Sequence, residues 1–184
     1  MTETIRLPKY FATTNTNKLQ EISDILGFPL EQISLDLLEP QGLDVREVVT
    51  TKAKDAYERT GKAVLVEDTG LAIVAWNGLP GALIKWFMET VGNEGILRML
   101  TAETNRRATA TTAVGFYDGT TMHLFVGELS GTVPHEQKGE SSFGWDPIFV
   151  PNGHTKSFAE MTKEEKNTVS MRKIAVMKMR DTFC

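Results

Sequence analysis

A run of hydroxyl, amide and ammonium side chains near the start of the chain has the chemistry to bind phosphate. The run reads Thr13, Thr14, Asn15, Thr16, Asn17 and Lys18. Residues 10–12 favour a short buried strand, and an apolar stripe over 17–26 favours a helix that stops at Gly27. A helix N-terminus offers N–H groups and a positive dipole end to an anion. The run therefore suits a phosphate site, although a solvated turn capped by Asn15 has the same composition.

Two adjacent acids, Glu67 and Asp68, follow the apolar run 63–66, which has the composition of a buried strand. We expect them at the carboxyl end of that strand, where α/β sheets collect functional groups. Adjacent side chains on an extended chain point to opposite faces, so one acid would face metal or water and the other the scaffold. Glu39 could add a third carboxylate, and such oxygens suit Mg²⁺. An ordinary surface or capping carboxylate is the alternative for each acid.

An aromatic segment at 142–147 contains Phe143, Gly144, Trp145 and Asp146. An aromatic face can stack on a purine base, and glycine lets the backbone approach a ligand closely. Asp146 or backbone groups could then contact the edge of the base. An aromatic cluster that closes the core beside a proline-bounded turn explains the same residues equally well.

Three basic residues, Lys52, Lys166 and Arg172, could add positive charge to such a site. Lys52 falls in the middle of a helix expected over 45–60, where a solvated side chain is the usual outcome. Lys166 and Arg172 are six positions apart, so one ideal helix would point them about 120° apart. We expect them to share a site if the helix breaks before Ser170.

The composition excludes several classes of function. The chain has 184 residues and a net charge of -4, which fits one globular domain and argues against nonspecific binding to polymeric nucleic acid. One cysteine, Cys184, allows no disulfide within the chain, and no apolar run suits a membrane helix or a secretory leader. We therefore expect a cytoplasmic protein. The three histidines have no metal-ligand spacing, and both the Walker motif and G-x-G-x-x-G are absent.

Elements of both kinds must position these residues, which favours an α/β fold with a mixed sheet. Strands are expected over 33–38, and over 109–117 and 121–129 as a hairpin turning at Asp118-Gly119. Helices are expected over 45–60 after an Asp44 cap, over 82–91, over 94–100, and from Thr162, where Glu165 completes a capping box. Ser170 would cap a final helix, and residues 134–142 suit a loop.

Five motifs in this order resemble the inosine triphosphate pyrophosphatase family over almost the whole chain. They are residues 13–18 against the family pattern T-G-N-x-x-K, residues 66–69, residues 78–81 with Ile84-Lys85-Trp86-Phe87, residues 143–147, and residues 159–161 followed by 165–167 and 170–172. The resemblance implies a single ITPase-like domain over 1–184 with two lobes, a long mixed β-sheet flanked by helices and a cleft between the lobes. It also implies a homodimer, a purine nucleoside triphosphate substrate, and Mg²⁺ as cofactor, with Mn²⁺ as an alternative.

The resemblance also implies roles for the residues. Asn15, Lys18 and Lys52 would contact the triphosphate, and Glu39 and Asp68 would bind the metal ion. Phe143 to Asp146 and Lys166 would hold the base and sugar, and Arg172 would contact the 6-keto oxygen. The candidate catalytic residues are Asp68, Glu67 and Lys18.

Two positions depart from the family pattern. Thr14 replaces a glycine, and Met171 replaces the histidine of a Ser-His-Arg motif. Methionine cannot donate a strong hydrogen bond, so base discrimination would either be weaker or rest on Arg172 and backbone groups alone.

The implied reaction converts ITP, dITP and XTP to the monophosphate and pyrophosphate by attack of water on the α-phosphorus, which cleanses the nucleotide pool. A Maf-type pyrophosphatase acting on other modified nucleotides is a first alternative. A nucleotide sensor without turnover is a second, which the replacements at Thr14 and Met171 would allow.

Overall fold

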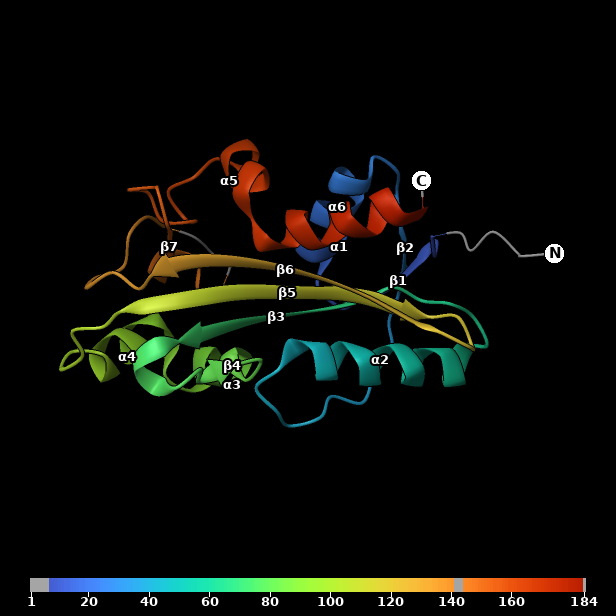
Figure 1. Ribbon diagram of the computed structural model, residues 1–184, viewed down its shortest axis with the longest axis horizontal. Helices are drawn as coiled ribbons and strands as arrows, with labels where there is room; N and C mark the ends of the chain where they lie inside the picture. The colour runs from blue at the N-terminus through green and yellow to red at the C-terminus, as the bar shows by residue number, and fades with distance from the viewer. Residues whose placement is uncertain (1–6, 141–143, 184) are drawn as a thin grey trace.

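The computed structural model describes residues 7–140 and 144–183, which form a sheet between two layers of helices (Figure 1). The strands are β1 (Tyr10–Ala12), β2 (Glu31–Ile33), β3 (Val66–Ile73), β4 (Pro80–Gly81), β5 (Arg107–Tyr117), β6 (Met122–Thr132) and β7 (Val150–Pro151). The α-helices are α1 (Thr16–Leu26), α2 (Val45–Thr60), α3 (Ile84–Thr90), α4 (Gly92–Met99), α5 (Lys163–Val169) and α6 (Met171–Phe183). Single turns of 3-10 helix cover Val74–Trp76 and Asp146–Ile148. None of the described helices combines the length and the apolar character needed to span a membrane.

The central sheet is antiparallel in the described residues, with the strand order β4-β3-β5-β6-β7. Parallel pairing occurs beside it, where β1 pairs with β2 and Phe11 bridges to Leu65 just before β3. Ala12 N donates to Leu65 O at 2.9 Å, and Leu65 N donates to Tyr10 O at 2.8 Å. The two arrangements together confirm the expected α/β fold with mixed strand directions.

Alternation along the strands divides the core between the two helix layers (Figure 1). On β5, Ala113 packs with the α2 residues Val49 and Ala53, whereas its neighbour Val114 packs with Val176 of α6. Such alternation is the expected consequence of the two-residue period of a strand. The sheet is therefore covered on both faces, by α2, α3 and α4 on one side and by α1, α5 and α6 on the other.

Glycine permits the close approach that brings α6 to the site. A Cβ built at Gly127 on β6 would lie 1.9 Å from the carbonyl oxygen of Met171, a distance that no side chain tolerates. Because Gly127 has no side chain, the N-terminus of α6 lies directly on the sheet. This contact fixes where Met171 and Arg172 enter the site.

The helix boundaries with strong local signals are confirmed. Helix α2 begins after an Asp44 cap and ends at Gly61, whose φ is 65°. Thr162 and Glu165 form the capping box of α5, and Lys173 N donates to Ser170 Oγ at the start of α6. The hairpin also forms, with β5 and β6 paired from Arg107–Thr132 to Tyr117–Met122. Local capping and turn chemistry was therefore sufficient to identify these elements.

Other predictions need correction. The strand expected over 33–38 is wrong, because β2 covers Glu31–Ile33 and the following segment runs over α2, where Leu38 N donates to Asp55 Oδ2. Strand β3 continues to Ile73, so Glu67 and Asp68 lie inside the strand and not at its carboxyl end. The helix expected from residue 82 begins later, because Leu83 N closes a turn to Pro80 O. Residues 141–143 lie outside the described residues.

Candidate functional site

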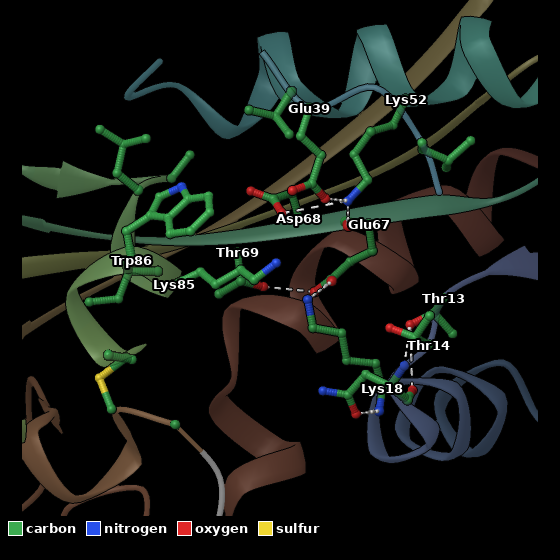
Figure 2. Close-up of a pocket in the computed structure, with 18 of the residues that line it drawn as sticks. Thr13, Thr14, Lys18, Glu39, Lys52, Glu67, Asp68, Thr69, Lys85 and Trp86 are labelled. Carbon is green, nitrogen blue, oxygen red and sulfur yellow. Dashed lines mark hydrogen bonds and ion pairs between the residues drawn. The ribbon is translucent and has the colours of Figure 1, made fainter. Parts of the chain in front are cut away.

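The site forms where one edge of β3 lacks a neighbouring strand. This edge pairs with β1 at Leu65 and with β4 from Leu71 onward. In the described part of the chain, no strand pairs with the edge over residues 66–70. The side chains of Glu67 and Asp68 leave the intervening stretch toward opposite faces of the sheet (Figure 2). Both nevertheless line one cleft of about 870 Å³, because the open edge can be reached from both faces.

On one face of β3, Glu67 is held between two cations. Its Oε2 lies 2.6 Å from Lys18 Nζ, its Oε1 accepts from Arg172 Nε at 3.1 Å, and the same oxygen forms an ion pair with Arg172 Nη2 at 3.0 Å. Thr69 Oγ1 donates to the same carboxylate at 2.7 Å. The Glu67 side chain is 0% exposed, and that of Arg172 is 2% exposed. Glu67 is therefore a buried counter-ion between α1 and α6.

On the other face, Lys52 of α2 holds two carboxylates together (Figure 2). Its Nζ lies 2.7 Å from Glu39 Oε1 and 3.8 Å from Asp68 Oδ1, and it donates to the outward carbonyl of Glu67 at 3.3 Å. Lys52 is buried, so the solvated helix face considered from the sequence is wrong. A lysine between two acids marks a position where positive charge is favourable.

The two neighbouring acids have opposite pKa shifts. Burial would raise the pKa of Glu67, but the charges of Lys18 and Arg172 outweigh burial and lower that pKa to about 2. For Asp68, burial raises the pKa to about 6 against the opposing charges of Lys52 and Lys18. Neighbouring carboxylates with separated pKa values take different chemical roles. Asp68 can exchange a proton near neutral pH, whereas Glu67 remains ionised.

The opening turn has the geometry of a capped helix N-terminus. Asn15 Oδ1 accepts from Asn17 N at 3.0 Å and from Lys18 N at 3.1 Å, and Thr13 Oγ1 accepts from Asn15 N at 3.0 Å. Thr14, Asn15 and Asn17 are exposed and line the cleft, whereas Thr16 is exposed but does not line it. Thr14 is not among the described non-glycine residues with positive φ, so it fits this turn without a left-handed backbone.

The far end of the cleft contains the aromatic segment and the C-terminal helices. Asp146 and Lys166 form an ion pair at 2.6 Å, and burial raises the pKa of Asp146 against the charge of Lys166. Trp145 is mostly buried and packs edge-on against Phe149, so it supports the core as well as lining the cleft. Phe143 lies outside the described residues.

A break between α5 and α6 brings Lys166 and Arg172 to the same cleft, as expected. Ser170 has an extended ψ of 145°, which ends α5 and redirects the chain. Met171, the first residue of α6, is 3% exposed and also lines the cleft. The buried thioether of Met171 therefore stands among the polar residues at this end.

Three residues at the site had no role in the sequence analysis. Lys85 of α3 lines the cleft opposite Lys18 (Figure 2), and it lay within a quoted motif. Glu21 accepts from Arg172 Nη1 at 2.5 Å, and its spacing of three residues from Lys18 on one helix could have drawn attention to it. Asn93 Nδ2 donates to Gly144 O at 3.1 Å, a contact that no local sequence signal predicts.

The donor set suits a hard divalent ion that also binds substrate oxygens. In the described residues, no group of three or more His, Cys, Asp or Glu side chains could hold a metal ion. Glu39 and Asp68 offer two carboxylates beside one cation, which fits Mg²⁺, because Mg²⁺ commonly takes one or two carboxylates together with phosphate oxygens and waters. With Lys18, Lys52 and Lys85, the cleft can bind a compact polyanion.

Comparisons with known proteins agree over nearly the whole chain. Residues 9–182 match the model of the Ham1 family. An inosine triphosphate pyrophosphatase of Schizosaccharomyces pombe is 45% identical over 93% of this chain and 92% of its own length. A dITP/XTP pyrophosphatase of Methanopyrus kandleri is 39% identical over 94% of each chain. The structure of a HAM1 protein from Coxiella burnetii matches with a TM-score of 0.84 and 25% identity, over 94% of this chain and 96% of that one.

Proposed function

This chain belongs to the Ham1 family, and on that premise we propose that it hydrolyses ITP, dITP and XTP to the monophosphate and pyrophosphate. Such a reaction removes non-canonical purine nucleotides from the nucleotide pool. The observation that carries the proposal is the position of Asp68: a partly buried carboxylate with its pKa raised to about 6 stands beside lysines that can bind a triphosphate.

The phosphate chain binds at the open edge of β3. Lys18 and Lys52 reach this edge from its two faces, and Lys85 faces it from α3. The N-terminus of α1 supplies a further anion-binding end through residues 13–17. Fixed positive charge around the departing pyrophosphate stabilises the negative charge that develops on it.

Asp68 orients the attacking water and accepts its proton. A base is most effective when its pKa lies near the working pH, and burial brings Asp68 to about 6. Glu67, with a pKa near 2, cannot take this role and keeps Lys18 and Arg172 in place. We therefore assign Glu67 to the support of the site and Asp68 to the chemistry.

Glu39 and Asp68 would hold Mg²⁺, with Mn²⁺ as an alternative. When bound, the ion supplies additional positive charge to the phosphate oxygens. Lys52 lies between the same two carboxylates and keeps them close together before the substrate arrives. We also propose the homodimer and the cytoplasmic location that the resemblance implies.

The base lies at the end of the cleft formed by Asp146, Lys166 and Arg172. A 6-keto oxygen accepts a hydrogen bond from Arg172, whereas the 6-amino group of adenine presents a donor and leaves the arginine unmatched. A buried polar group without its partner is costly, so this mismatch discriminates against ATP. Gly144 and Trp145 line this end of the cleft and would flank the base, and we keep the role in base binding that the resemblance implies for Phe143.

Pyrophosphate release from ITP, dITP, XTP, GTP, ATP and their deoxy forms, with and without Mg²⁺, tests the proposal. We expect IMP and pyrophosphate from ITP in the presence of Mg²⁺. Release of single phosphate would contradict attack at the α-phosphorus. Turnover of modified pyrimidines in preference to ITP would favour the Maf-type alternative, and binding without turnover would favour the sensor.

A further inference from the structure

Arg172 is held between two carboxylates that come from different elements. Glu67 of β3 occupies the edge of the guanidinium formed by Nε and Nη2, at 3.1 and 3.0 Å. Glu21 of α1 accepts from Nη1 at 2.5 Å. Because the guanidinium is planar and rigid, contacts at both Nη atoms fix the direction in which its plane faces.

The two carboxylates belong to one chain of alternating charges. Lys18 and Glu21 lie three residues apart on α1, where side chains share a face. Lys18 pairs with Glu67 (Figure 2), Glu67 pairs with Arg172, and Arg172 pairs with Glu21. The chain thus begins and ends on α1, and it joins a residue of the phosphate end to a residue of the base end.

Glu21 is poorly explained as a residue that stabilises the fold. Its side chain is 16% exposed, and its second oxygen, Oε1, is buried without a hydrogen-bond partner. A buried carboxylate oxygen that lacks a partner lowers stability. Glu67 already pairs with Nε and Nη2 of Arg172, and it shares its charge with Lys18. The specific contribution of Glu21 is the contact that fixes Nη1.

We propose that Glu21 is a positioning residue that sets the selectivity for 6-keto over 6-amino purines through Arg172. Glu21 holds the guanidinium in one orientation. In that orientation its N–H groups can donate to a 6-keto oxygen, and they cannot rotate away from the N–H groups of a 6-amino substituent. This inference rests on the proposed function, and it concerns the choice of base and not the attack on phosphorus. Loss of Glu21 should therefore affect ITP more than ATP.

The test compares Glu21→Ala and Glu21→Gln with the matched control Asp24→Ala. Asp24 is the next acid on α1, and like Glu21 it lines a second pocket of about 310 Å³ beside the cleft. Asp24 accepts a hydrogen bond from Gln20 and none from Arg172. Pyrophosphate release from ITP and ATP gives kcat/KM for each nucleotide. We expect Glu21→Ala to lower the ITP-to-ATP ratio about tenfold, mainly through KM for ITP. Glu21→Gln keeps an acceptor oxygen and should lower the ratio about threefold, and Asp24→Ala should leave it unchanged.

The outcomes separate this inference from the function on which it rests. If the wild-type chain releases no pyrophosphate from ITP, the proposed function fails. If the wild-type chain is active but both Glu21 variants keep its ITP-to-ATP ratio, only this inference is overturned. An equal loss of turnover on ITP and ATP also overturns it, because a purely structural role predicts that result. Thermal unfolding shows whether each variant folds. If Glu21→Ala does not fold, the ITP-to-ATP ratio of Glu21→Gln decides between the outcomes.

Discussion

Replacement of Glu67 by glutamine tests whether this residue supports the site electrostatically. The pKa of Glu67 is lowered from 4.5 to about 2, since Lys18 and Arg172 outweigh the effect of burial, which alone would raise it. A difference of this size corresponds to about 3 kcal/mol of stability in the ionised state. The range measured for breaking buried ion pairs, roughly 3–5 kcal/mol, agrees with this value. We expect Glu67→Gln to lower the free energy of unfolding by about 3 kcal/mol at pH 7.

The pH dependence of this loss follows from the sign of the shift. The folded pKa lies below the unfolded pKa, so the stabilisation is complete above the unfolded value of 4.5 and is lost as pH falls toward about 2. The difference between wild type and variant should stay near 3 kcal/mol above pH 5 and fall to about 2 kcal/mol at pH 3.5.

Urea unfolding at pH 7, 5 and 3.5, followed by circular dichroism, measures these differences. In thermal unfolding at pH 7, the melting temperature of the variant should fall by roughly 6–12 °C, given the length of the chain. Glu39→Gln is the control, because Glu39 also pairs with a lysine but its side chain is 46% exposed, and its loss should cost at most about 1 kcal/mol. A cost below about 1 kcal/mol for Glu67→Gln, or a difference that does not shrink in acid, would refute the reasoning.

Further predictions concern Asp68, Asn93 and Met171. Asp68→Asn should cut pyrophosphate release at least about 100-fold while nucleotide binding persists, and near-normal turnover would remove Asp68 from the mechanism. Burial raises the pKa of Asp68 from 3.8 to about 6, so its ionised form costs stability above pH 6. The same variant without metal should therefore be about 3 kcal/mol more stable at pH 8 and gain almost nothing at pH 3, and calorimetry at both pH values checks this. Asn93→Ala removes the hydrogen bond to Gly144 and should raise KM for ITP by about 2- to 10-fold with kcat unchanged, whereas a loss confined to kcat would contradict a role in holding this loop. Met171→His introduces a donor at the base end and should raise the ITP-to-ATP preference several-fold; an unchanged preference would show that position 171 does not set selectivity.

The sequence determined the elements whose signals lie within a few residues of one another. Asp44 and Gly61 bound α2, and Thr162 with Glu165 starts α5, because capping hydrogen bonds and left-handed glycines act within a single helical turn. The opposite orientations of Glu67 and Asp68 were also predictable, since neighbours on a strand must face opposite ways. Lys18, Asp68 and Arg172 were identified because their motifs are local, and all three line the cleft.

Tertiary structure decided what these residues do. The apolar run 63–66 predicted where a strand would be, but β3 extends to Ile73 because β4 and β5 supply hydrogen-bond partners that lie far away along the chain. The open edge of β3 therefore could not be predicted from the sequence. For the same reason, the sequence did not show that Glu67 and Asp68, which point to opposite faces of β3, line one cleft. The burial of Lys52 likewise depends on Glu39 and Asp68, which come from other segments.

The surroundings of Arg172 illustrate the same division. Sequence motifs identified Arg172, but its partner Glu21 lies 151 positions away, and its contact requires α6 to rest on the sheet at Gly127. Pairing over such a distance has no local signature, because it depends on how the two helices pack. Residue type and short spacing thus determined which groups are present, and long-range packing determined which charges face each other and how far their pKa values move.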